Sequence, residues 1–171
     1  LLPGPGEDLC FLAGDWRILQ RVGGHRWSLD DLCTAWWAAR RVGAPPARHV
    51  DLGCGIGTVL LLLAWKFPGL EGVGLEAQAL SVELARRSIG WNGVDARCRV
   101  RRVDFREPEA TAGLGPQDLV TGTPPPTLSP TLPPTIAPEQ REATGIALTN
   151  TALARARPIT QTAEVIRAET Q

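Results

Sequence analysis

Segments with a strand-like pattern of hydrophobic residues alternate with segments of helical periodicity along the middle of the chain. Four short segments predict strands, at residues 48–52, 71–75, 97–103 and 118–122. Residues 59–66 and 78–89 predict helices between them, which end at Pro68-Gly69 and Asn92-Gly93. Strands that alternate with helices in this way form a parallel sheet with right-handed crossovers. The pattern therefore predicts a doubly wound α/β fold of about four mostly parallel strands, in the order 3-2-1-4.

The two flanking regions differ from this core in composition. Residues 1–46 predict a strand pair around Gly23-Gly24 and then a helix from Ser28 to about Arg40, in which Asp31 stands where a capping carboxylate belongs. We expect the tryptophans of this helix in the core. Residues 123–138 contain seven prolines, which exclude a central strand or a helix there. The predicted organisation is an N-terminal hairpin and helix (1–46), a core (47–123) and a disordered or weakly helical tail (124–171).

Composition narrows the classes of partner. Eighteen basic and eighteen acidic residues give no net charge, so nothing global favours nucleic acid or a membrane surface. No apolar stretch reaches the roughly 18 residues of a membrane span. The four cysteines lack metal-ligand spacing, and the histidines, His25 and His49, stand apart from any matching pattern, so we expect no metal site. We read the cysteines as reduced thiols of an intracellular compartment that the sequence does not identify.

The chemistry is concentrated after the first central strand. Glycines 53, 55 and 57 lie between this strand and a helix, where they permit positive φ and let a ligand approach the backbone. Glu76 ends the next strand, where a carboxylate can accept hydrogen bonds from both hydroxyls of a ribose. Asp104 ends the third strand and borders the same crevice. This register predicts a nucleoside-containing ligand; the alternative is a glycine turn that only packs helix on strand, with Glu76 in solvent.

An acidic residue two positions before the first glycine bears on which nucleoside-containing ligand is bound. Asp51 would repel a pyrophosphate but suits the ammonium group of an amino-acid moiety, and the spacing is GxGxG rather than the GxGxxG of dinucleotide sites. The segment VDLGCGIGT resembles motif I of the class I S-adenosylmethionine-dependent methyltransferases, a Rossmann-like family. The resemblance implies S-adenosylmethionine as cofactor. The residues expected to bind it are Gln20, Asp51, Gly53, Cys54, Gly55, Gly57, Glu76, Ala77, Asp104 and Phe105.

A second motif follows the fourth strand. The residues TGTPPP at 121–126 resemble motif IV of the amino-methylating branch of that family, usually Asn-Pro-Pro-Tyr, in which the Asn holds the acceptor amino group and the aromatic ring stacks on an extruded base. By this resemblance Thr123, Pro124, Pro125 and Pro126 form the catalytic, acceptor side. Thr123 replaces the usual Asn, so a hydroxyl stands in place of the amide, and Pro126 replaces the aromatic residue, so the base-stacking ring is absent.

A third resemblance concerns the methyl acceptor. The segment ILQRVGGHRWSLDDLCTAWWA resembles the part that precedes motif I in the bacterial tRNA(Val) adenine N6-methyltransferase family, which implies an adenine amino nitrogen in RNA as acceptor and RNA as partner. Members of that family continue beyond motif IV, so we expect a truncated chain. Three alternatives stay open: a methyltransferase of the same fold that acts on a protein or small molecule, a non-catalytic remnant, and, least favoured, a nicotinamide-dependent oxidoreductase.

Arginines 97, 99 and 101 alternate along the third predicted strand, which lies at an edge of the sheet. A basic edge can contact phosphates. It can equally be a solvated edge that resists aggregation.

Overall fold

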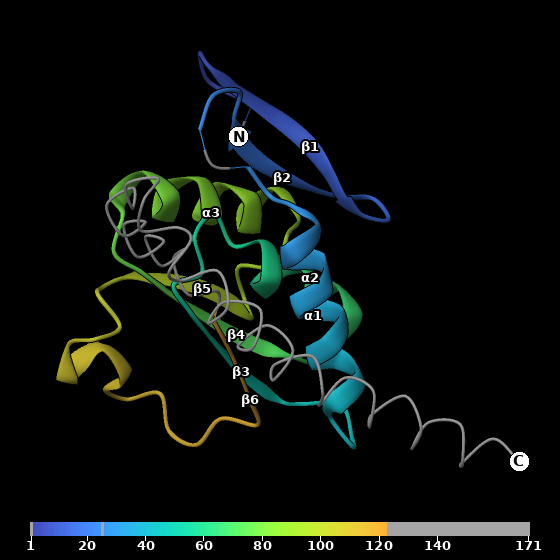
Figure 1. Ribbon diagram of the computed structural model, residues 1–171, viewed down its shortest axis with the longest axis vertical. Coiled ribbons are helices and arrows are strands. Elements are labelled where there is room, and N and C mark those ends of the chain that lie inside the picture. Colours follow the sequence, from blue (N-terminus) through green and yellow to red (C-terminus); the bar gives the residue numbers. More distant parts are fainter. Residues whose placement is uncertain (1, 25, 123–171) are drawn as a thin grey trace, which may run out of the picture. The chain divides into compact units, whose positions relative to one another are not determined.

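A four-stranded parallel sheet forms the centre of the protein. The computed structural model describes residues 2–24 and 26–122. The strands of the sheet are β3 (Arg48–Leu52), β4 (Glu71–Glu76), β5 (Cys98–Arg102) and β6 (Leu119–Gly122). Their order, β5-β4-β3-β6, and their parallel pairing confirm the predicted α/β fold and strand order (Figure 1). The predicted tail, 124–171, lies outside the described residues.

Three helices cover one face of this sheet: α1 (Leu29–Arg41), α2 (Thr58–Lys66) and α3 (Ala79–Trp91). Every residue of α2 from Thr58 to Ala64 is buried, because this part of the helix packs against the sheet, α1 and the hairpin, and only its last two residues are exposed. A helix that is apolar all round belongs in such a position. Within the described residues, no helix combines the length and the hydrophobicity needed to span a bilayer.

The opposite face of the sheet has a much thinner cover. Val50, Val73 and Leu75 pack there against Ala110 and Leu114, which belong to the connection between β5 and β6. That connection contains only the short 3-10 helix η1 (Pro108–Thr111), whereas the other two crossovers carry helices of 9 and 13 residues. Parallel strands usually need a full helix in the crossover. The described residues therefore cover this face over only part of its length.

Helix α1 begins as predicted but buries a different face. The backbone N–H of its N-cap, Ser28, donates to Asp31 Oδ2 at 2.9 Å, as in a capping box. The prediction that the helix tryptophans lie in the core is wrong, because Trp36 and Trp37 are both 55% exposed. The helix turns small residues such as Ala35 inward, which allows close packing on α2, and the rings lie beneath the guanidinium groups of arginines on the same helix.

The N-terminal hairpin is present but its turn was predicted in the wrong place. Its strands are β1 (Glu7–Ala13) and β2 (Trp16–Arg21), and the two-residue connection is Gly14-Asp15. Gly14 has a φ of 54°, which glycine adopts without steric cost. Gly23-Gly24 instead lies beyond β2, where the chain leaves the hairpin. Leu12, Ile18 and Leu19 join the same hydrophobic cluster as α2 and α3.

Strand β4 contains two glycines because its neighbours lie too close for a side chain. A Cβ on Gly74 would stand 2.5 Å from Cys54 Sγ, 3.0 Å from Cys54 Cβ and 3.2 Å from Val100 Cγ2. A Cβ on Gly72 would stand 2.6 Å from Leu60 Cδ1. Cys54 follows directly on β3, so the empty position at Gly74 lets the turn after β3 settle against β4.

We therefore predict that Gly74→Ala lowers the free energy of unfolding by about 1–3 kcal/mol, the usual cost of overpacking a core. Urea unfolding followed by circular dichroism measures it. Gly43→Ala is the matched control, since a Cβ there meets nothing within 4 Å and the φ of Gly43 is not positive. This control should stay within about 0.5 kcal/mol of the natural protein. Equal effects of the two substitutions would show that the turn does not depend on close contact with β4.

Candidate functional site

The turn after β3 is built from backbone conformations that glycine favours. Gly53, Gly55 and Gly57 have φ values of 68°, 55° and 87°. The N–H groups of Gly53 and Cys54 both donate to the carbonyl oxygen of Leu75, at 2.8 and 3.0 Å. The turn is therefore fastened to the carboxyl end of β4, the strand next to β3.

The carboxylate of Glu76 strengthens this link. Its Oε2 accepts the N–H of Gly55 at 2.9 Å, and its Oε1 accepts the N–H of Gln78, the N-cap of α3, at 2.8 Å. Glu76 is only 7% exposed, so the alternative of a solvated side chain is wrong. Each carboxylate oxygen retains a free lone pair for another donor. A Cβ placed on Gly55 would meet nothing within 4 Å, so open space adjoins the turn beside this carboxylate.

A chain of hydrogen bonds lies beneath the turn, between β3 and β6. The hydroxyl of Thr121 donates to Asp51 Oδ1 at 2.7 Å, and His49 Nε2 lies 2.7 Å from the same hydroxyl oxygen. Because the hydroxyl proton points to Asp51, the imidazole must carry its own proton on Nε2. His49 Nδ1 is then a buried acceptor, and it has no partner within the described residues. All three side chains are less than 10% exposed.

Burial shifts the pKa values of Asp51 and His49, the two ends of this series of hydrogen bonds. Burial raises the pKa of Asp51 from 3.8 to about 6, and the hydrogen bond from Thr121 opposes the shift only in part. The negative charges of Asp31 and Glu76 raise it further. Burial lowers the pKa of His49 from 6.5 to about 4, so its imidazole is neutral at pH 7. At pH 7 Asp51 therefore carries a negative charge that neither Thr121 nor the neutral His49 balances.

A comparison with protein families identifies the family to which this domain belongs. The sequence from residue 39 to residue 125 matches the profile of the methyltransferase small domain, which is about half of the chain. The chain belongs to the small-domain methyltransferase family. The matched residues contain the glycine turn, Glu76 and the hydrogen-bonded pair Asp51–Thr121. Membership of this family supports S-adenosylmethionine as the cofactor, in agreement with what the resemblance of the glycine segment to motif I implies.

The domain is similar to several characterised methyltransferases. It is 28% identical over 96 residues to the tRNA1(Val) (adenine(37)-N6)-methyltransferase of Porphyromonas gingivalis strain W83, covering 55% of this chain and 38% of that protein. It is 32% identical over 77 residues to the release factor glutamine methyltransferase of Chlorobaculum tepidum, covering 44% of this chain and 26% of that protein. The chain therefore spans well under half the length of these relatives.

A solved structure shows the same fold. The crystal structure of P. horikoshii TYW2 in complex with MeSAdo superposes with a TM-score of 0.51 over 61% of this chain and 38% of that one, at 18% identity. The likeness concerns the arrangement of helices and strands, and it supports the Rossmann-like fold of the small-domain methyltransferase.

The residues predicted to hold the cofactor fall into two groups. The glycine turn, Glu76 and Asp51 lie together at the carboxyl ends of β3 and β4, where Glu76 accepts the N–H of Gly55. Cys54 lies within the turn and Ala77 follows Glu76, whereas Gln20 and Asp104 make contacts of their own. Gln20 is buried and accepts the N–H of Trp27 at 3.3 Å. Asp104 binds the guanidinium of Arg106, which lowers the pKa of its carboxyl to about 2.

Contacts between the cofactor and the individual residues stay predictions, including those of Ala77 and Phe105, which are exposed, and of Cys54, which is buried. The acceptor residues Thr123–Pro126 lie outside the described residues. His49 and Thr121 were not predicted to belong to the site. The sequence signal for them is weak, because His49 stands between Arg48 and Val50 in a strand of mixed polarity and Thr121 is a polar residue next to Val120.

The opposite shifts of Asp51 and His49 predict how stability depends on pH. The raised pKa of Asp51 means that its contribution to stability is full below pH 3.8 and is lost as the pH rises to about 6. The lowered pKa of His49 means that its contribution is full above pH 6.5 and is lost as the pH falls to about 4. The two effects oppose each other over the same range and largely cancel in the natural protein.

The substitution Asp51→Asn removes one side of this balance. We predict that the variant gains stability relative to the natural protein as the pH rises from 4 to 6.5, by roughly 3 kcal/mol in total. Urea unfolding at several pH values measures the difference. His49→Leu is the mirror control, and it should lose stability relative to the natural protein over the same range. Differences that do not change with pH in both variants would show that neither group titrates in this way.

Proposed function

We propose that this small-domain methyltransferase binds S-adenosylmethionine and transfers its methyl group to the amino nitrogen of an adenine in a structured RNA. The observation that carries the proposal is the carboxylate of Glu76, held by the N–H groups of Gly55 and Gln78 beside the open surface of the glycine turn. Ligands of open α/β sheets bind at this end of the strands.

The residues of the chain bind and orient, while the cofactor supplies a methyl group on a sulfonium, from which it leaves readily. Glu76 accepts hydrogen bonds from the ribose hydroxyls with the lone pairs that its backbone donors leave free. Asp51, two residues before the turn begins at Gly53, contributes negative charge near the ammonium group, and Thr121 fixes the orientation of its carboxylate. Catalysis then depends mainly on the alignment of acceptor, methyl group and sulfur.

The residues proposed to hold the methyl acceptor come after β6 in the sequence. Gly122, its last residue, pairs with Leu52 at the end of the sheet that holds the glycine turn, and Thr123 is the next residue in the sequence. We propose that its hydroxyl and the carbonyl of Pro124 accept the two N–H bonds of the target amino group. The similarity to the Porphyromonas tRNA methyltransferase supports an adenine in RNA as the target.

A second candidate acceptor is the side-chain amide of a glutamine in a protein. The similarity to the Chlorobaculum release factor glutamine methyltransferase favours it. An amide and an adenine amino group present the same two N–H donors on a nitrogen with a delocalised lone pair, so one arrangement of acceptors suits both.

Methyl transfer from labelled S-adenosylmethionine separates the two candidates. We predict that the full chain labels unmodified transfer RNA, that nuclease digestion recovers the label as N6-methyladenosine, and that a bacterial release factor is not labelled. Thr123→Asn together with Pro126→Tyr should increase the rate about tenfold to a hundredfold, because a base-stacking ring contributes on the order of 1–3 kcal/mol. Label on the release factor alone would replace RNA by protein as the substrate, and label on neither would contradict the proposed activity.

A further inference from the structure

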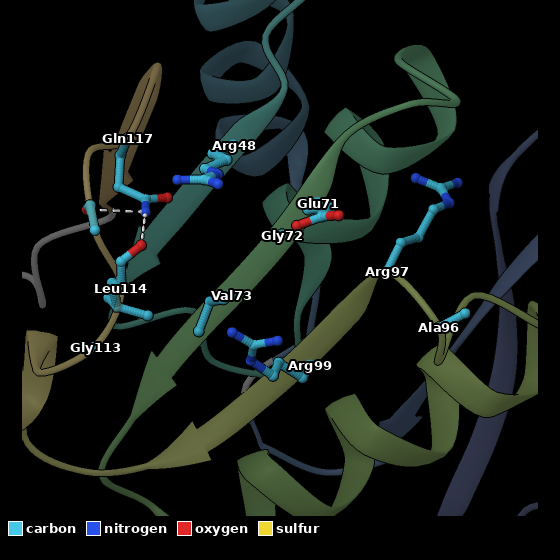
Figure 2. Close-up of a pocket in the computed structure, with 11 residues that line it drawn as sticks. Arg48, Glu71, Gly72, Val73, Ala96, Arg97, Arg99, Gly113, Leu114 and Gln117 are labelled. Carbon is cyan, nitrogen blue, oxygen red and sulfur yellow. Dashed lines mark hydrogen bonds between the residues drawn. The ribbon is translucent and has the colours of Figure 1, made fainter.

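A second candidate site lies at the opposite end of the sheet from the glycine turn. A cavity of about 390 Å³ opens at the amino ends of β3, β4 and β5 (Figure 2). Its other wall is the connection between β5 and β6, at Gly113, Leu114, Gly115 and Gln117. The cavity exists because η1 covers only part of this face, and no long crossover helix fills the space above the first residues of the strands.

Three arginines line this cavity, and they have different roles. Arg97 is held in place, because its guanidinium donates to the carbonyl oxygens of Leu70 at 3.1 Å and Ala64 at 3.0 Å. Arg48 and Arg99 are exposed, and within the described part of the chain their guanidinium groups form neither a hydrogen bond nor an ion pair. These two arginines come from strands on either side of β4, so two unused planar donors face one space.

One carboxylate stands among these arginines. Glu71 pairs in register with Arg48, and Val73, two residues on, pairs with Arg99, so the alternation along the strands places all four residues on one face of the sheet. Figure 2 shows Arg48, Glu71 and Arg99 around the cavity, each on a different strand. The ligand must therefore offer an anion to the guanidinium groups and a hydrogen-bond donor to the carboxylate. The two exposed guanidinium groups against one carboxylate leave the cavity positive overall.

We propose that this cavity binds the sugar-phosphate backbone of RNA. Arg48 and Arg99 bind a phosphate, for which the planar fork of arginine is suited. Glu71 accepts the hydrogen bond of the 2′-hydroxyl, the group that distinguishes RNA from DNA. Each phosphate of RNA has such a hydroxyl beside it, on the ribose, whereas the deoxyribose of DNA has none. The inference goes beyond methyl transfer, because RNA can bind here whether or not the glycine turn binds S-adenosylmethionine.

Fluorescence anisotropy with a labelled RNA hairpin and the DNA hairpin of the same sequence tests this site without any cofactor. We predict that the full chain binds the RNA more tightly than the DNA. Arg48→Gln and Arg99→Gln should each weaken RNA binding roughly fivefold to tenfold and reduce the slope of log affinity against log salt by about one. Arg21→Gln removes an exposed charge from the distant hairpin and is the control, with an affinity unchanged from that of the natural protein.

Glu71→Gln provides the sharper test, because simple electrostatics and the proposed contact predict opposite results. Loss of a negative charge alone would strengthen the binding of RNA and DNA alike. The proposed hydrogen bond instead predicts that RNA binding weakens towards the level of DNA. Equal strengthening for both nucleic acids, or arginine variants that bind RNA as Arg21→Gln does, would overturn the proposal. Absence of RNA binding in the natural chain would also overturn it, whereas binding at the glycine turn is measured separately with the cofactor.

Discussion

The structure of the site depends on one buried carboxylate. Glu76 accepts the N–H of Gly55 on one side and the N–H of Gln78 on the other, and so joins the turn after β3 to the first turn of α3. Two more N–H groups of the same turn reach the carbonyl oxygen of Leu75, the residue before it. These bonds require β3 and β4 to be neighbours, which the strand order provides, and they require the absent side chain of Gly74, against which Cys54 packs. The crevice at the carboxyl ends of the strands is thus shaped mainly by hydrogen bonds from backbone N–H groups of the turn.

The electrostatic character of this crevice follows from the same burial. Asp51 and Glu76 bring two carboxyl groups close together away from water, and no cation neutralises them within the hydrogen-bonded chain of His49, Thr121 and Asp51. Burial raises the pKa of the Cys54 thiol, and these two carboxylates raise it further, so this cysteine is not a thiolate nucleophile. Such a site repels a pyrophosphate and attracts a ligand with positive groups, as S-adenosylmethionine has in its sulfonium and ammonium. At the other end of the sheet, the cavity lined by arginines carries a positive charge.

Local patterns were sufficient for the parts of the fold that are regular. The pattern of residues 48–122 predicted the four strands and their order. The positions of Gly55 and Glu76 placed them at one crevice, because the carboxyl ends of neighbouring parallel strands lie at the same edge of the sheet. Contacts between distant segments were not visible. Thr121 meets His49 across 72 residues, and only the register of β3 with β6 reveals it. Trp36 and Trp37 were assigned to the core by hydrophobicity, although α1 buries Ala35 instead. The hairpin turn was missed because Gly23-Gly24 is a stronger local signal than Gly14-Asp15.

Calorimetric titration of the full chain with S-adenosylhomocysteine tests the central claim most directly. The account predicts micromolar binding that Glu76→Ala abolishes and that Glu83→Ala, at an exposed carboxylate on the outer side of α3, leaves unchanged. Circular dichroism of the variants shows whether each retains its fold. Binding by a folded Glu76→Ala variant as tight as that of the natural protein would contradict the assignment of the ribose to Glu76, and no binding by the folded natural chain would contradict the cofactor site itself.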